Sequence, residues 1–104
     1  MSLKKKFLKS KPVCKVTFRL AKAAAQEAST VALVGDFNDW NLEQPIALKA
    51  LKSGDFKTVL DLETGKNYEY RYLLDGEKWE NDWDADQYVP SPYGVDNSVV
   101  MLEN

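Results

Sequence analysis

An alternation of apolar and polar residues with a period of two constrains the fold most strongly. In residues 13–20, VCKVTFRL, every second side chain is apolar, and in residues 68–74, YEYRYLL, three tyrosines alternate with Glu69 and Arg71. Successive side chains of a β-strand point to opposite faces of a sheet, so each stretch predicts a strand with one buried and one solvated face. The tyrosines are expected in the core because they share a face with Leu74.

Further short strands are expected between turn signals. The Asp75-Gly76 pair is typical of a two-residue hairpin turn with positive φ at both positions, and residues 53–55 and 63–67 are similar signals. Residues 45–51, PIALKAL, predict one strand that starts, or lies at an edge, near Pro45. About seven to eight strands arranged in this way predict an all-β fold, an antiparallel β-sandwich. The expected core contains Phe18, Leu33, Phe56, Leu60, Tyr70, Tyr72 and Val99.

The length and composition are those of one globular domain: 104 residues, of which 44% are hydrophobic and 29% charged. Residues 1–12 carry five lysines and predict a basic flexible leader, or alternatively a basic arm that binds a surface, while residues 13–104 predict the domain. No apolar run suits a secretory signal or a membrane span, so we expect a cytoplasmic protein without a membrane partner. The formal net charge of −2 argues against a nucleic-acid partner.

The chain has one cysteine and no histidine, which excludes several kinds of site. Cys14 lies within a predicted strand and is expected to be a small core residue rather than a nucleophile. Without histidine the chain cannot build a Ser/His/Asp or Cys/His catalytic centre, and almost every transition-metal site is excluded as well. We therefore expect neither a metal nor another cofactor.

The segment VALVGDFNDWN, residues 31–41, begins as a buried strand and ends in a polar turn that contains a tryptophan. Trp40 follows Asn38 and Asp39 in a setting too polar for a core. Two interpretations are open at this point. The indole either folds back over one end of the sandwich, or it is exposed for a partner that has a mildly apolar face.

This segment, together with YEYRYLLDGEKW at residues 68–79 and PYGVDNSVV at residues 92–100, resembles the family 48 carbohydrate-binding modules. That family includes the glycogen-binding domain of the β subunit of AMP-activated protein kinase. It also includes the N-terminal domains of isoamylases and of glycogen branching enzymes of glycoside hydrolase family 13. The resemblance runs from about residue 13 to residue 102, and it implies an immunoglobulin-like β-sandwich of the early set type that binds α-glucans without catalysis.

The resemblance also implies a set of sugar-binding residues. Trp40 and Trp79 match two tryptophans that stack on glucose rings in the family. Arg71 stands where kinase-type modules have a lysine that donates hydrogen bonds to sugar hydroxyls, and Asn97 matches an asparagine that contacts hydroxyls. These four residues are therefore expected to bind carbohydrate.

Two positions depart from the family and put its fine ligand preference in question. Tyr93 stands where a leucine pierces the ring of a cyclic sugar ligand, and Val95 replaces a threonine. Tyr93 is still expected at the sugar site. Alternatives are open for two matched residues. Arg71 can be a solvated surface residue, or one that forms an ion pair with nearby Glu69 or Asp61. Asn97 can simply cap or terminate the loop before the last strand.

The chemistry of glucose explains why these residue types would form a site. The faces of a glucose ring carry axial C–H groups, which suit the flat indole of tryptophan. The rim of the ring is a belt of hydroxyls, which need fixed donors and acceptors such as Arg and Asn. Because an α-1,4-glucan curls, two tryptophans set at an angle can hold one turn of glycogen, starch or a maltooligosaccharide.

Other functions are alternatives to sugar binding. An accessory domain like that of isoamylase, which works beside a glycoside hydrolase family 13 enzyme or a protein partner in glycogen metabolism without binding sugar itself, is the main alternative. Glycoside hydrolysis needs two carboxylates across a cleft, which a chain of this size does not provide. Asp82, Asp84 and Asp86 imitate the start of an EF-hand loop, but Gln87 and Tyr93 replace the required glycine and glutamate.

Overall fold

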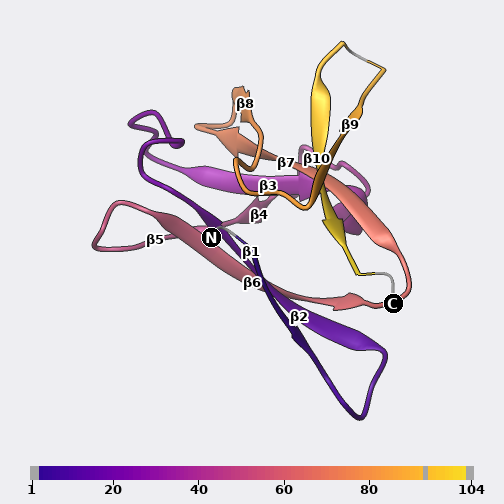
Figure 1. The fold of residues 1–104 in the computed structure, drawn as a ribbon. Coiled ribbons are helices and arrows are strands. Elements are labelled where there is room, and N and C mark those ends of the chain that lie inside the picture. The colour runs from indigo at the N-terminus through magenta and orange to yellow at the C-terminus, as the bar shows by residue number, and fades with distance from the viewer. Residues whose placement is uncertain (1–2, 93, 103–104) are drawn as a thin grey trace.

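A computed structural model describes residues 3–92 and 94–102 as two antiparallel sheets packed against each other (Figure 1). One sheet has the strand order β1-β2-β6-β5; the other has the order β4-β3-β7-β10-β9, with β8 added beside β7. The predicted antiparallel β-sandwich is confirmed. The elements are β1 (Leu3–Phe7), β2 (Val13–Leu20), β3 (Val31–Gly35), the 3-10 helix η1 (Asp36–Asn38), β4 (Ile46–Ala47), β5 (Lys49–Ala50), β6 (Phe56–Glu63), β7 (Asn67–Leu74), β8 (Lys78–Glu80), β9 (Gln87–Pro90) and β10 (Asp96–Met101).

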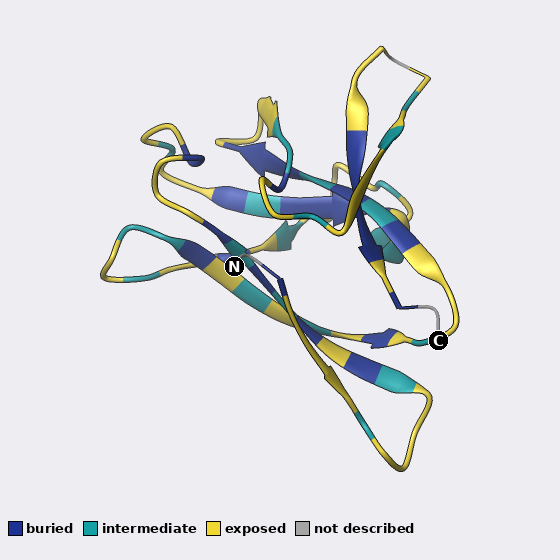
Figure 2. Ribbon diagram, viewed as in Figure 1, coloured by how far each residue is buried: buried dark blue, intermediate teal, exposed yellow. Residues whose placement is uncertain are grey.

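The core lies between the two sheets and follows the period-two pattern (Figure 2). Phe18, Tyr70 and Tyr72 are fully buried, and Phe18 packs edge-on against Tyr70 with ring centroids 5.1 Å apart. Leu33 and Phe56 are buried in the core too, and Leu60 is half-buried and packs against it. The prediction for Val99 is wrong: this residue is buried, but it pairs with Glu69 and therefore lies on the outer face of its sheet. Cys14 is fully buried, and burial raises the pKa of its thiol, as a structural cysteine requires.

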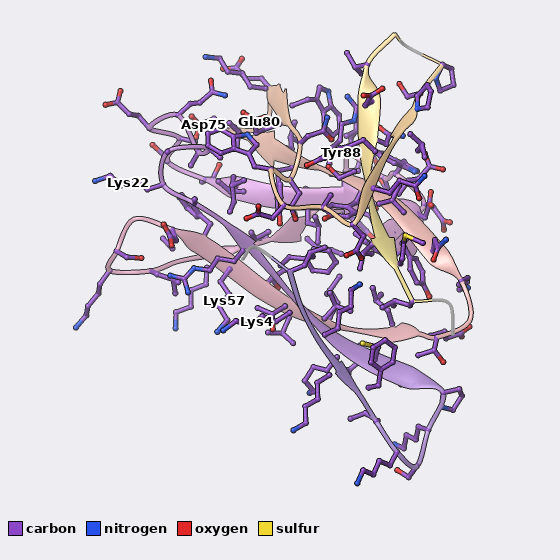
Figure 3. The ribbon with its side chains drawn as sticks, in the orientation of Figure 1. Lys4, Lys22, Lys57, Asp75, Glu80 and Tyr88 are labelled. Carbon is purple, nitrogen blue, oxygen red and sulfur yellow. The ribbon has the colours of Figure 1, made fainter. Side chains whose placement is uncertain are left out.

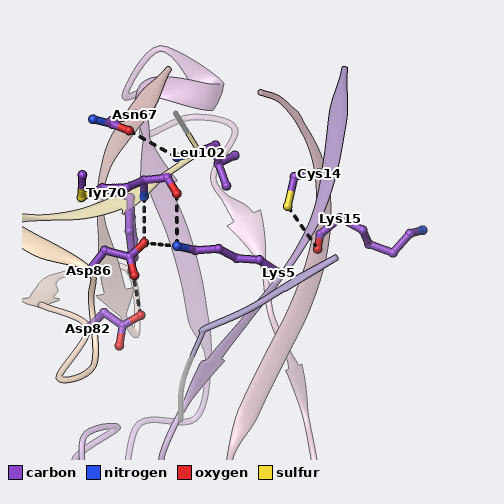
Figure 4. Close-up of polar contacts among 9 residues, drawn as sticks. Lys5, Cys14, Lys15, Asn67, Tyr70, Asp82, Asp86 and Leu102 are labelled. Carbon is purple, nitrogen blue, oxygen red and sulfur yellow. Dashed lines mark hydrogen bonds and ion pairs between the residues drawn. The ribbon is translucent and has the colours of Figure 1, made fainter. Parts of the chain in front are cut away.

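The first residues of the chain correct the prediction of a flexible leader. Leu3–Phe7 forms strand β1, which pairs with β2 along its whole length from Leu3 opposite Phe18 to Phe7 opposite Cys14. Leu3 is buried, and the Lys5 ammonium pairs with Asp86 at 2.5 Å across the side of the sandwich (Figure 4). Edge strands of sheets often carry lysines, so a lysine-rich sequence does not exclude a strand at this position.

Residues 45–51 also differ from the prediction, since they form two short strands in place of one. Ile46–Ala47 pairs with β3 in the larger sheet, and Lys49–Ala50 pairs with β6 in the smaller sheet. Leu48, between them, is buried, and its N–H donates to the Val31 carbonyl at 2.9 Å. The chain therefore crosses from one sheet to the other at Leu48.

A buried carboxylate fastens the segment that follows β8. Asp82 is fully buried, and its Oδ2 accepts a hydrogen bond from the Tyr70 hydroxyl at 2.7 Å (Figure 4). Its N–H donates to the Ser98 hydroxyl at 2.9 Å. Burial, reinforced by this carboxylate, raises the pKa of the Tyr70 and Tyr72 hydroxyls, so both stay protonated. Asp82 is thus a structural anchor; the described residues contain no group of ligands suited to a metal ion.

No helix long and apolar enough to cross a membrane occurs in the part of the chain that the structure describes.

Candidate functional site

Strand β7 directs its residues alternately to the core and to the outer face of the six-stranded sheet. Tyr70 and Tyr72 point inward, so the alternating residues Glu69 and Arg71 lie on the outer face. On one side, β3 places Val34 opposite Arg71. On the other side of β7, strands β10 and β8 follow one another. Arg71 is therefore at the centre of this face.

Trp40 reaches this face from a tight loop after β3. Gly35 ends the strand where a Cβ would come within 2.5 Å of the Glu69 carbonyl oxygen, so the close approach to β7 requires glycine. Asn38 stabilises the turn by accepting a hydrogen bond from the Gly35 N–H at 3.0 Å. Asp39 and Trp40 then both adopt left-handed conformations, with φ of 56° and 54°. Two such non-glycine residues in succession are uncommon, so the contacts around the loop hold its backbone in this conformation.

Asp36 holds the Trp40 indole in a defined orientation. Its Oδ1 accepts a hydrogen bond from the indole Nε1 at 2.8 Å, and its Oδ2 accepts one from the backbone N–H of Glu69, also at 2.8 Å. One carboxylate thus connects the tryptophan loop to strand β7. The Trp40 side chain is half-buried and does not fill the core.

Trp79 reaches the same face through the hairpin between β7 and β8. Asp75 and Gly76 have φ of 51° and 73°, the two positive φ angles that the sequence predicts. The loop is one residue longer than a two-residue turn, because Glu77 also lies between the paired residues Leu74 and Lys78. The hairpin pairs Trp79 with Leu73, whose side chain lies on the outer face and is buried beneath its neighbours. Trp79 keeps 39% of its surface exposed, so its indole is not part of the core.

Arg71 lies between the two tryptophans. Its guanidinium carbon is 4.7 Å from the centroid of the Trp79 ring and 5.7 Å from that of the Trp40 ring. Both distances are within the range of cation–π contacts. The two indoles and the guanidinium therefore gather on one side of the molecule, as predicted, and we call Trp40, Arg71 and Trp79 the tryptophan–arginine cluster.

Asn97 lies inside β10 and not in the loop before it. It pairs with Val89 of β9, and its Nδ2 donates to Glu69 Oε1 at 3.0 Å. Its Oδ1 is buried and accepts no hydrogen bond from a described residue. An unpaired buried acceptor costs about 1–3 kcal/mol, so the position of this amide is maintained at a cost in free energy. Asp61, one possible partner for Arg71, lies on the other sheet with Lys15.

Tyr93 lies outside the described residues, so its predicted place at the site stays a prediction. Val95, in the turn between β9 and β10, is 48% exposed. The Ser91 N–H donates a hydrogen bond to the Val95 carbonyl at 2.9 Å, and this bond closes the turn. The turn therefore joins β9 to β10, the strand that carries Asn97.

Asp36 and Glu69 are the site residues that sequence analysis missed. They link the site in a chain: the Trp40 indole to Asp36, Asp36 to the Glu69 N–H, and the Glu69 carboxylate to Asn97. The alternation of β7 put Glu69 on the same face as Arg71 and could have indicated it. The residues next to Asp36 in the sequence do not indicate that its carboxylate forms hydrogen bonds with two separate segments.

A hollow with mainly apolar lining lies elsewhere, between the loop at residues 21–28 and strand β6, where Ala25, Ala28 and Phe56 contribute. None of the described candidate residues lines it. The tryptophan–arginine cluster is instead an open surface, as a site for a long polymer chain would be.

Two comparisons with known proteins bear on this site. The family model described as the glycogen recognition site of AMP-activated protein kinase matches residues 23–103, which is most of the chain. No curated protein gives a significant match. The matched segment contains the whole tryptophan–arginine cluster and Asn97. Such a match over a chain of this length identifies a non-catalytic, carbohydrate-binding domain.

Proposed function

Because this chain belongs to the family of the glycogen recognition site of AMP-activated protein kinase, we propose that its tryptophan–arginine cluster binds α-glucan chains. The observation that carries the proposal is the convergence of two tryptophans from separate loops on one arginine. No requirement of the core brings them together, since Trp79 is exposed and Trp40 is half-buried. Glycogen, starch and maltooligosaccharides present the same α-linked glucose units to such a surface.

Each residue of the proposed site has a distinct part in binding. Trp40 and Trp79 offer indole surface to the C–H faces of successive glucose rings. Arg71 donates hydrogen bonds to rim hydroxyls, and its planar guanidinium keeps the two indoles apart at a fixed spacing. Asn97 contacts a sugar hydroxyl through its amide group, which Glu69 orients. Tyr93 is proposed to contribute to the site as well.

The affinity for short glucans is expected to be low. Each sugar hydroxyl exchanges a hydrogen bond to water for one to the protein, so the net gain from a single bond is small. The stacked area supplies most of the favourable free energy. Asp36 limits the loss of side-chain freedom on binding, because the Trp40 indole is already held by its Nε1 hydrogen bond.

Isothermal titration with maltoheptaose and β-cyclodextrin tests the proposal, with a β-linked glucan of equal length as the matched control ligand. We expect heat from both α-glucans and none from the β-linked chain. Equal binding of the β-linked chain would contradict a site shaped for curled α-glucans. Absence of binding to all three would favour the accessory-domain alternative.

A further inference from the structure

The outer face of the four-stranded sheet carries a group of cations that glycan binding does not use. Every second residue of β2 points into the core, so the intervening side chains point outward. The same alternation holds in β6. The registers of β1 and β5 place their outward residues on this side as well. We define the basic face by its six cations: Lys4, Lys6, Lys15, Arg19, Lys49 and Lys57.

The strand registers put like charges directly opposite one another on the basic face. Lys57 is the partner of Arg19 on one side and of Lys49 on the other, which makes a row of three cations across three strands. Lys6 is likewise opposite Lys15. Like charges at opposed positions of a sheet are destabilising, so folding alone does not explain these rows.

Only part of this charge is compensated within the protein. Arg19 pairs with Asp55 at 2.8 Å, and Lys15 pairs with Asp61 at 3.6 Å. Within residues 3–92 and 94–102, the remaining four lysines of the basic face form no ion pair. Figure 3 shows two of them, Lys4 and Lys57, on the side of the four-stranded sheet that faces away from the other sheet.

Charge is segregated along the whole chain, in spite of the small net charge. Residues 1–60 contain eleven of the fourteen Lys and Arg but five of the sixteen Asp and Glu. Residues 61–104 contain the other three cations and eleven acidic residues. The protein therefore has a strong charge asymmetry, which points to an anionic partner for the basic part.

We propose that the basic face binds the surface of a membrane that contains anionic phospholipids. Protein–protein interfaces are depleted in lysine and enriched in aromatic residues, whereas the outward positions of these four strands carry five lysines and no aromatic residue. Single-stranded nucleic acids require aromatic stacking, which this face lacks. Lysines spread over a sheet surface suit a broad, diffuse anionic layer, to which each adds attraction within a Debye length.

This binding is peripheral and needs no membrane-spanning segment. The expectation of no membrane partner follows from the lack of an apolar run long enough to span a membrane. Electrostatic adsorption of a basic surface does not require such a run. The tryptophan–arginine cluster lies on the outer face of the opposite sheet, so it stays accessible while the basic face is occupied. The proposal is independent of glycan binding.

Vesicle co-sedimentation of the full chain tests the proposal. The probes are vesicles of phosphatidylcholine alone, and vesicles of phosphatidylcholine and phosphatidylserine in equal parts. We expect binding to the anionic vesicles only, and its loss at high salt. The Lys49→Gln/Lys57→Gln variant should bind about 25-fold more weakly, from about fivefold per lysine.

The matched control is the Lys66→Gln/Lys78→Gln variant, which also removes two cations but from outside the basic face. It should bind anionic vesicles like the wild type, and both variants should bind maltoheptaose unchanged. The proposal is overturned if neither kind of vesicle binds, if neutral vesicles bind equally, or if both variants weaken binding to the same extent. Failure of maltoheptaose binding in the wild type would instead contradict the proposed function alone.

Discussion

The outer faces of the two sheets have the same strand geometry, but they differ in how far their side chains interact with one another. On the six-stranded sheet, side chains are tied to each other: Asp36 to Trp40, Glu69 to Asn97, and Arg71 between two indoles. On the four-stranded sheet, most cations have no ion-pair partner among the described residues. The comparison teaches that a linked face is organised in advance for a ligand of defined shape, whereas an unlinked face suits diffuse attraction.

The largest expected difference between the faces comes from removing a tryptophan. Trp40→Ala and Trp79→Ala should each weaken binding of maltoheptaose by roughly 30-fold, from about 2 kcal/mol per aromatic contact. Calorimetric titration measures this loss. Lys57→Gln, on the opposite face, should leave the affinity for maltoheptaose unchanged.

Thermal unfolding separates a binding role from a structural one in these variants. Since neither tryptophan belongs to the buried core, both variants should melt close to the wild type. A buried tryptophan would cost about 3–5 kcal/mol on truncation and lower the melting temperature by several degrees. Lower melting in both variants would mean that the indoles are structural.

A smaller effect is expected from the carboxylate that links the site. Asp36→Ala removes the acceptor for the Trp40 indole and for the Glu69 N–H. We expect about tenfold weaker binding of maltoheptaose, from about 1.5 kcal/mol for hydrogen bonds to a charged group. The proton resonance of the Trp40 indole should also move. An unmoved resonance would show that Asp36 does not position this side chain.

Replacing Arg71 with alanine should weaken the binding of maltoheptaose by about fivefold. Arg71→Ala loses a cation–π contact worth about 1 kcal/mol, whereas Arg71→Lys keeps the charge but loses the planar group. Titration with maltoheptaose should therefore rank the affinities wild type, Lys variant, Ala variant. Equal affinity for all three would remove Arg71 from the site.

The smallest effect is expected at Asp55, which forms an ion pair with Arg19 of the basic face. Asp55 accepts hydrogen bonds from the Lys22 N–H and from Arg19, and these lower the pKa of its carboxyl below the usual 3.8. A lowered folded-state pKa adds stability that is present above pH 3.8 and lost as the pH falls through the folded value. Chemical unfolding from pH 5 downward should show that the free energy of unfolding declines less steeply in Asp55→Asn than in the wild type. Parallel declines would contradict this.

Much of the fold could be predicted from the sequence because its signals are local. The alternation in β2 and β7 places Phe18, Tyr70 and Tyr72 in the core, and the Asp75-Gly76 turn requires only two residues to be recognised. Strand β1 was missed because its pairing depends on a partner strand rather than on its own lysine-rich sequence.

The candidate site was predictable in part for the same reason. The tryptophans and Arg71 were identified by resemblance, and the structure brings them together. The link through Asp36 could not be predicted, because it joins residues 33 positions apart in the chain. The cytoplasmic location and a protein partner in glycogen metabolism stay predictions.

The most direct test of the central claim uses all three tryptophans as reporters. The chain contains three, so a nitrogen–proton correlation spectrum should give three indole signals, assignable by Trp→Phe variants. Trp83 is the internal control, since it is 59% exposed but not part of the cluster. On titration with maltoheptaose, we predict that the Trp40 and Trp79 signals shift together while the Trp83 signal stays in place. A shift of the Trp83 signal alone would contradict the account.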